Sequence, residues 1–452
     1  MRCVVVPINR SDFVFESSFS SIVRSYEIFR PHKLVILYAN FNKVHLQRLS
    51  DLLSELRKKG VNVVTKEIHD QSFDEFKGMI KEEVKGCEKV YLVPTSGANI
   101  IAVYLALLHA QEKYPLVNFI FRFGPWTSFY YPFVPRSMEK VMVLGDSTPT
   151  NVKLDLNLDG YLSDTLFTKT VQAMAIKLNK ALDKEGEEDL VLKINEEPVL
   201  STASSSYRDV KNILSELTAK DSSLISTEKY RDPSKTILSL AGAYEIEVDL
   251  RGELHESRQK EEDKGSPTGS NAPPHISTVE EVSYGRNVII DTNLVYFGIH
   301  THEVRNLVIP YCVHNEVLWN VNTKTKFSNA VFYVYEALRE RARMIPSEST
   351  ICDVAIPKIE PDLIKGSVIL TGDNFTFNRW KKLAVNSYTD IFRVRVGEKE
   401  RSGKVNVSAV IFNLAAILGL MGVEGVEVCW KGGTCVSPHE RDPTAKNSKN
   451  TV

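Results

Sequence analysis

Short β-branched runs alternate with helical patterns over the first 145 residues, and this alternation restricts the fold more than any other feature of the chain. Arg2–Pro7, Leu34–Tyr38 and Lys89–Val93 are short apolar runs of the kind that form buried strands. Between two of them, Val44–Lys59 places its leucines on one helical stripe. Strands joined by helices are typical of βαβ units, which build parallel sheets. The pattern therefore predicts an α/β domain over residues 1–145.

A polar segment separates this region from a second predicted domain. Arg251–His275 has only two apolar side chains apart from its prolines, Leu254 and Ala272. Such a segment cannot bury enough apolar area to offset the entropy of ordering. We expect a flexible linker over residues 251–284, a second α/β domain over 285–437, and a loose polar tail over 438–452.

The intervening residues 146–250 predict a mixed α+β middle region. Asp164–Asp183 and Tyr207–Leu217 have helical patterns, and Ala243–Leu250 is strand-like. Helices followed by an alternating segment fit a winged-helix module, or equally an extension of the first sheet or a dimerisation surface. Tyr207–Leu217 carries only Arg208 and Lys211 as basic residues, which argues against a DNA-recognition helix.

The overall charge gives no footprint of nucleic-acid binding. Lysines and arginines number 56 and acidic residues 57, so any such contact must come from a local patch. No apolar run reaches the roughly 18 residues that a membrane helix needs. Val407–Val423 is interrupted by Asn413 and predicts a buried helix, and the N-terminus lacks the pattern of a signal peptide. We expect a cytoplasmic protein with no membrane partner.

Six scattered cysteines include no CxxC pair, so a structural zinc site is not expected. Cys429 and Cys435 flank a short loop that a disulfide can close. Free thiols are the favoured expectation for a cytosolic protein, with the disulfide as the alternative.

Four acidic residues mark the second domain. Asp291 directly follows one apolar run, and Asp373 comes soon after another. Ligands of open α/β sheets bind at the carboxyl ends of the strands. Carboxylates gathered there repel one another unless a cation compensates, and Mg²⁺ prefers such oxygen ligands. A lone Asp at a strand end is more often a cap or turn residue, so the prediction depends on the combination with Glu316 and Asp353.

With these acids, residues from about Ser283 to Val428 resemble the PIN nuclease domain. The family signature begins with a strand that enters Asp-Thr-Asn, here Asp291-Thr292-Asn293, and its last acid ends a Thr-x-Asp step, here Thr371-Gly372-Asp373. Glu316 follows a strand–Pro segment, and Asp353 precedes Asp373 by 20 residues, as in the family. The resemblance implies a metal-dependent ribonuclease with Mg²⁺ or Mn²⁺ as cofactor, in which Asp291, Glu316, Asp353 and Asp373 are both catalytic residues and metal ligands.

Two details of this assignment stay open. Prolines follow Asp353 at positions 357 and 361, so the usual long helix must be short there, and Asp362 and Asp390 are alternatives for its role. Arg379, Lys381 and Lys382 follow the fourth acid and are candidates for binding RNA phosphates, with Trp380 and Phe377 as stacking partners for bases. The alternative is a solvated basic helix face.

Two loops of the first domain have the composition of an anion site. Asn9, Arg10, Ser11 and Asp12 follow the first strand, and Thr95, Ser96, Gly97, Ala98 and Asn99 lie in and after the loop that follows Lys89–Val93. Small residues let backbone N–H groups approach phosphates, and a helix N-terminus favours anions. The alternative is that Ser96-Gly97 only caps the next helix.

These loops and the order of elements resemble the CARF domain, the Rossmann-like sensor of CRISPR-associated defence proteins. The resemblance implies a cyclic oligoadenylate, with the tetra-adenylate favoured, bound across a homodimer. The chain is thus expected to be a CRISPR-associated effector in which a CARF domain controls a PIN ribonuclease in antiviral defence. The alternatives are a ligand-responsive DNA-binding regulator, and a constitutive RNA-processing nuclease whose first domain only dimerises.

Overall fold

The computed structural model forms two compact units, Met1–Ser163 with Gln172–Glu188, and Asp164–Val171 with Asp189–Val452. Both are mixed α/β with parallel strands, so the predicted fold class is confirmed. The structure describes residues 1–8, 15–39, 43–69, 72–97, 99–121, 126, 129–145, 153–182, 189–204, 206–221, 224, 232–250, 276–321, 325–431 and 433–439.

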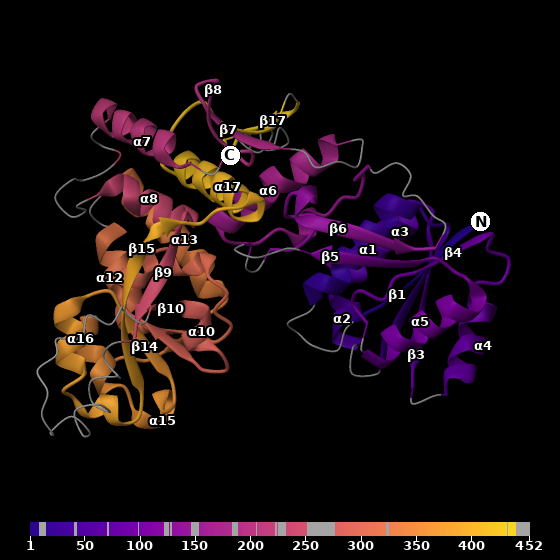
Figure 1. The fold of residues 1–452 in the computed structure, drawn as a ribbon, viewed down its shortest axis with the longest axis horizontal. Helices are drawn as coiled ribbons and strands as arrows, with labels where there is room; N and C mark the ends of the chain where they lie inside the picture. The colour runs from indigo at the N-terminus through magenta and orange to yellow at the C-terminus, as the bar shows by residue number, and fades with distance from the viewer. Residues whose placement is uncertain are drawn as a thin grey trace, which may run out of the picture. The chain divides into compact units, whose positions relative to one another are not determined.

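A six-stranded sheet forms the first unit, in the order β3-β2-β1-β4-β5-β6 (Figure 1). Strands β1 to β5 run parallel, and β6 pairs antiparallel with β5. The strands are β1 Arg2–Pro7, β2 Lys33–Ala39, β3 Asn62–Ile68, β4 Lys89–Leu92, β5 Leu116–Phe121 and β6 Glu139–Leu144. The helices are α1 Phe15–Phe29, α2 Lys43–Arg48, α3 Ser50–Lys58, α4 Phe73–Glu83, α5 Asn99–Glu112 and α6 Leu166–Ala181, with short 3-10 helices η3 Arg136–Met138 and η4 Asp159–Tyr161.

Helices cover both faces of this sheet. One face of β1, β2 and β4 packs under α4 and α5 in a fully apolar cluster that includes Val5, Leu37 and Leu92. On the other face, Phe29 of α1 stacks on Tyr91 of β4 with ring centroids 4.1 Å apart. Burial on both faces explains why these strands are continuous apolar runs without alternation.

A second, seven-stranded sheet has the order β10-β9-β15-β14-β11-β12-β13. Its strands β11 to β15 run parallel, and β9 and β10 are antiparallel additions at one edge. The strands are β9 Tyr244–Asp249, β10 Ile276–Thr278, β11 Val288–Ile290, β12 Leu307–Pro310, β13 Arg343–Ile345, β14 Val368–Thr371 and β15 Asp390–Glu400. The helices are α7 Arg208–Lys220, α8 Pro233–Ala241, α10 Val279–Ser283, α11 Asn293–Tyr296, α12 Tyr311–Val321, α13 Lys326–Glu340, α14 Cys352–Ala355, α15 Pro361–Ile364, α16 Asn374–Trp380 and α17 Lys404–Leu420, with 3-10 helices η5 Ile299–Thr301, η6 Ile356–Lys358 and η7 Ala384–Ser387.

The two sheets share one winding pattern. The order β3-β2-β1-β4-β5 of the first unit recurs as β13-β12-β11-β14-β15 in the second. In each, the chain adds strands on one side of its first strand and then crosses to the other side. The switch points therefore lie between β1 and β4, and between β11 and β14, where ligands of such sheets bind.

A small antiparallel sheet, β17-β16-β7-β8, completes the second unit. Its strands are β7 Leu190–Ile194, β8 Glu197–Ser201, β16 Val426–Trp430 and β17 Cys435–Val436. The apolar helix α17 packs near it and is buried from Val407 to Gly419, as the sequence predicts. Among the residues described, no helix combines the length and apolarity of a membrane span.

The domain boundaries predicted from the sequence need correction. Residues 146–250 are not a separate module, because β7 pairs with β16 and β9 pairs with β15, both far along the chain. Residues 276–283, which we placed in the linker, form β10 and α10; Thr278 caps α10 in a capping box with Glu281. The proposed linker core 251–275 and most of the proposed tail, residues 440–452, lie outside the described residues.

The expectation of free thiols at Cys429 and Cys435 is wrong. The two residues face each other across β16 and β17, with Cα atoms 4.0 Å apart, and form a disulfide. Two further disulfides join Cys3 to Cys87 and Cys312 to Cys352, so none of the six cysteines is free.

Gly298 allows α8 to approach the turn after α11. Its φ is +81°, and a Cβ there would lie 2.0 Å from the carbonyl oxygen of Ser239 on α8. We predict that Gly298→Ala lowers the free energy of unfolding by more than about 2 kcal/mol, because neither backbone can yield cheaply. The control is Gly285→Ala, whose φ is +70° but whose Cβ would meet nothing within 4 Å. Denaturant unfolding that gives equal losses for both variants would contradict this close contact.

Candidate active site

Asp291 and Asp373 lie at the switch point of the second sheet. Strands β11 and β14 are neighbours, with Ile290 opposite Leu370, and the amide of Asp291 donates to the Leu370 carbonyl at 3.1 Å. Asp291 directly follows β11, and Asp373 is the N-cap of α16 two residues after β14. Parallel strands thus bring two acids separated by some eighty positions to one edge of the sheet.

Thr371 connects these two acids. Its hydroxyl donates to Asp291 Oδ2 at 2.9 Å and accepts from the amide of Asp373 at 3.2 Å. Asn293 Nδ2 also donates to Asp291 Oδ2, at 3.0 Å, and the amide of Thr292 donates to Asp291 Oδ1 at 2.7 Å. Three hydrogen bonds therefore fix the orientation of the Asp291 carboxylate, and none of the three donors carries a positive charge.

Glu316 reaches the same place from α12. The hydroxyl of Thr292 donates to Glu316 Oε2 at 2.5 Å, and the amide of Cys352 donates to Glu316 Oε1 at 2.8 Å. Carboxylate oxygens of Asp291 and Glu316 and the Cys352 sulfur lie within 4.8 Å of one another. Because that sulfur is in a disulfide, the ligand atoms available to a hard cation are the carboxylate oxygens.

Asp353, on the one-turn helix α14, completes the group. Thr376 of α16 donates its hydroxyl to Asp353 Oδ1 at 2.9 Å and its amide to Asp373 Oδ1 at 2.6 Å. Asp353 thus lines the same cavity as the other three acids, and its role as the third acid of the set stays a prediction. Of the two alternatives, Asp390 pairs with Arg286 and Asp362 is exposed on α15; neither lines the cavity.

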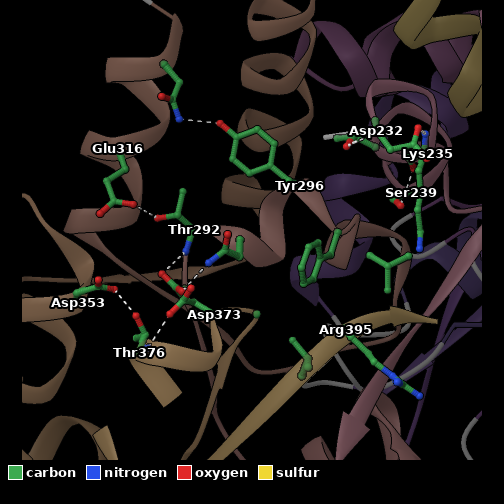
Figure 2. A pocket seen from close by; sticks show the side chains of 18 of the residues that line it. Asp232, Lys235, Ser239, Thr292, Tyr296, Glu316, Asp353, Asp373, Thr376 and Arg395 are labelled. Carbon is green, nitrogen blue, oxygen red and sulfur yellow. Dashed lines mark hydrogen bonds between the residues drawn. The ribbon is translucent and has the colours of Figure 1, made fainter. Parts of the chain in front are cut away.

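All four acids line one open cavity of about 1090 Å³, and Figure 2 shows Thr292 and Thr376 among them. Asp291 is 3% exposed, and burial raises its pKa to about 6, with the nearby charge of Glu316 adding to the effect. Hydrogen bonds from Thr371, Thr292 and Asn293 oppose this rise. A divalent cation would relieve the cost of ionising Asp291, and an all-carboxylate donor set fits Mg²⁺ or Mn²⁺.

The disulfide Cys312–Cys352 supports this geometry. Cys312 lies one helical turn before Glu316 on α12, and Cys352 immediately precedes Asp353. The bond therefore ties together the two short segments that carry these acids.

Sequence analysis missed the residues that organise the acids, Thr292, Thr371 and Thr376. Two of them belong to the quoted motifs, but their hydroxyl partners depend on the tertiary structure. The proposed stacking role of Trp380 is wrong, because its ring is fully buried and its Nε1 donates to the Asp353 carbonyl at 3.1 Å. Trp380 instead fixes α14 against α16.

The predicted RNA-binding residues lie away from the cavity. Arg379 lies in the last turn of α16, Lys381 and Lys382 follow the helix, and none of the three lines the cavity. Phe377 is half-buried, and the Lys381 ammonium lies 5.8 Å from its ring centroid. Their role in RNA binding stays a prediction.

The candidate sensor loops flank the switch point of the first sheet. Ser96 is buried, and its hydroxyl donates to the Pro7 carbonyl at 2.5 Å, so it joins the loop after β4 to the last residue of β1. Thr95 donates to Asn118 Oδ1 and accepts from the Phe119 amide. Gly97 fits tightly, since a Cβ there would lie 2.7 Å from the Pro7 ring, and Asn99 is exposed at the start of α5. Asn9, Arg10, Ser11, Asp12 and Ala98 lie outside the described residues.

Comparison with known proteins gives weak similarities only. No family model and no curated protein match the chain. Among solved structures, Can2 from Sulfobacillus thermosulfidooxidans in complex with cyclic tetra-adenylate is 13% identical over 57% of each chain, with a TM-score of 0.27. Csm6 from Enterococcus italicus bound to cyclic hexa-2'-fluoro-hexa-dAMP is 16% identical over 26% of this chain and 32% of that chain, with a TM-score of 0.22.

Protein VC1899 from Vibrio cholerae is 14% identical over 56% of this chain and 54% of its own, with a TM-score of 0.25. The chain thus covers less than two thirds of each of the three structures. TM-scores this low do not establish a shared overall fold.

The acid cluster predicts a pH-dependent response to metal. Because the raised pKa of Asp291 keeps its proton up to about pH 6, a cation must displace that proton at lower pH. We expect Mg²⁺ to raise the melting temperature by a few degrees at pH 7.5 and by much less at pH 5. Asp291→Asn should remove the response at both values. Thermal unfolding of Asp362→Asn, an exposed acid outside the cavity, provides the matched control and should behave as wild type. A Mg²⁺ response that is the same at both pH values, or that survives in Asp291→Asn, would exclude the site.

Proposed function

We propose that the second unit is a metal-dependent endoribonuclease of the PIN type. The observation that carries the proposal is the convergence of Asp291, Glu316, Asp353 and Asp373 on one cavity at a topological switch point. Four acids on four separate segments, joined by threonine hydroxyls, go beyond what helix capping requires. Asp373 does cap α16 and Glu316 accepts the amide of Cys352 at the start of α14, but Asp291 is not the N-cap of a helix.

In this proposal the residues of the cavity have different roles in hydrolysis. The four carboxylates would hold Mg²⁺ or Mn²⁺, which activates water and stabilises charge on a phosphate undergoing in-line displacement. Thr371 and Asn293 fix the orientation of Asp291, and Thr292 fixes Glu316. Lys235 and Arg395 lie on the opposite side of the cavity from these four carboxylates, beside Asp232 (Figure 2), and would contact an RNA backbone there.

We further propose that the first unit is a CARF-like sensor of cyclic oligoadenylate, and that the whole chain is a CRISPR-associated effector. The support is the same switch-point architecture, with the loop after β4 joined to the end of β1 by the Ser96–Pro7 hydrogen bond. Since the hydroxyls of Thr95 and Ser96 already have partners within the unit, they position the loops. Ligand phosphates would then be bound by backbone amides, by Asn99, and by Arg10.

An exposed apolar surface on the first unit supports a homodimer. Ile100, Val103 and Leu107 follow one face of α5 and are each 43% exposed or more. Beside this helix, on the same face of the sheet as the half-buried Leu116, the β5–β6 pair exposes Met142 and Leu144. Contiguous apolar surface of this kind marks an interface, and a two-fold ligand matches an isologous dimer.

The rival functions receive less support. A DNA-binding regulator would need a recognition module, but residues 146–250 are distributed over the two units and contribute β7, β8 and β9 to the sheets of the second. A constitutive nuclease shares the proposed active site and differs only in its response to ligand, so the assay below separates the two.

The nuclease is tested by RNA cleavage with Mg²⁺ or Mn²⁺, with and without cyclic tetra- and hexa-adenylate. We expect metal-dependent cleavage that changes with one of the two rings. Asp291→Asn, Asp373→Asn and Asp353→Asn should abolish it because each removes a carboxylate of the shared site, and Asp362→Asn should not. Normal cleavage by the first two variants would refute the active site. A cleavage rate that neither cyclic tetra-adenylate nor cyclic hexa-adenylate changes would favour the constitutive nuclease.

Sensing is tested by calorimetric titration of the full chain with each ring. We expect one cyclic ligand per two chains, and roughly ten- to a hundredfold weaker binding by Arg10→Ala, the loss of one charge-assisted contact. Val103→Glu, which places charge in the exposed apolar surface, should give monomers that lose tight binding while metal-dependent stabilisation of the second unit remains. A stoichiometry of one ligand per chain would contradict the shared site.

A further inference from the structure

Trp319 is exposed to solvent, whereas the other three tryptophans are buried. Trp126, Trp380 and Trp430 are each 3% exposed or less, whereas Trp319 is 76% exposed. All four tryptophans of the chain are among the described residues. A large aromatic ring in water is costly where nothing covers it, so its position needs an explanation.

Trp319 lies beside the acids. It is on α12, three residues after Glu316, and residues with that spacing are neighbours on a helix surface. It lines the cavity together with Ile351, which is 57% exposed and immediately precedes the disulfide-bonded Cys352. The α12–α14 side of the acids is therefore an exposed aromatic and apolar wall.

The other side of the cavity carries two cationic side chains, Lys235 and Arg395, together with Asp232 (Figure 2). The Lys235 ammonium on α8 lies 5.8 Å from the Tyr244 ring centroid. Among the described residues, no carboxylate forms an ion pair with Lys235. Arg395 binds Glu247 at 2.8 Å, yet its side chain remains 57% exposed. An exposed aromatic wall, the four acids and a wall that carries Lys235 and Arg395 thus surround one volume.

We propose that Trp319 is a stacking platform for an RNA base next to the phosphate bound at the acids, with Lys235 on the next phosphate. This assignment rests on the proposed nuclease function and adds a residue that determines how substrate is held. Bases stack on aromatic rings whatever their identity, so Trp319 should bind any unpaired nucleotide. A protein partner is a poorer match, because the rest of the cavity lining is largely polar and charged.

Fluorescence tests the contact independently of cleavage. Because Trp319 is the exposed tryptophan, it should account for most acrylamide quenching of the wild-type chain. A mixed-sequence single-stranded RNA, added without divalent metal, should reduce that quenching several-fold. Trp319→Ala should show little quenching with or without RNA. Unchanged quenching at every RNA concentration would overturn the platform, even if cleavage is observed. Protection without cleavage under any condition would keep the platform and reject the nuclease.

Kinetics then separate stacking from a structural role. Trp319→Ala should raise KM for RNA about tenfold, the value of one stacked base, with kcat little changed. Trp319→Phe should restore most of the loss. On an RNA with an abasic residue at the stacked position, wild type and Trp319→Ala should become equal. Tyr284→Ala, which removes an aromatic ring that is 88% exposed and does not line the cavity, should match wild type throughout. A penalty for Trp319→Ala that persists on every abasic substrate would contradict stacking.

Discussion

The burial of Asp291 beside Glu316, in a cavity that two further acids line, is the constraint on which the second unit depends. Asp291 is almost fully buried, and its pKa of about 6 records the cost of charging it there. The surrounding structure holds the acids in place. Strands β11 and β14 bring two of them to one edge of the sheet, and threonine hydroxyls link these to the other two. The Cys312–Cys352 disulfide ties α12 to α14. Such an arrangement is costly unless a cation is bound for at least part of its working cycle.

The acids were predictable because their positions follow from local patterns. A buried strand that ends in a polar residue directs that residue to the carboxyl edge of a parallel sheet, and this holds for Asp291 and Asp373. Asp353 needed the resemblance to a family, since only the fold brings its one-turn helix beside α16. Trp380 shows where prediction from local sequence stops. Its place next to two lysines suggests exposure, but the burial of a side chain depends on what packs over it. Here α14 packs over Trp380. Trp319 carries no local signal that separates it from a core residue.

The predicted domain boundaries were wrong for a related reason. The strand pattern of β9 was recognised, but β9 pairs with β15 and β7 pairs with β16, both much later in the chain. Strand pairing at that distance leaves no mark in local composition. The same holds for the cysteines: spacing shows that Cys429 and Cys435 can approach, whereas the antiparallel β16–β17 pair decides that they do. The recurrence of one strand order in both units is likewise visible only in the fold.

Diffraction from crystals soaked in Mn²⁺ tests the central claim most directly, because manganese scatters anomalously and the acids are its proposed ligands. The account predicts an anomalous peak in the second unit's cavity, about 2.1 Å from carboxylate oxygens of Asp291 and Asp373, which disappears in crystals of Asp291→Asn. An empty cavity at saturating Mn²⁺, or a peak bound by other residues, would contradict it.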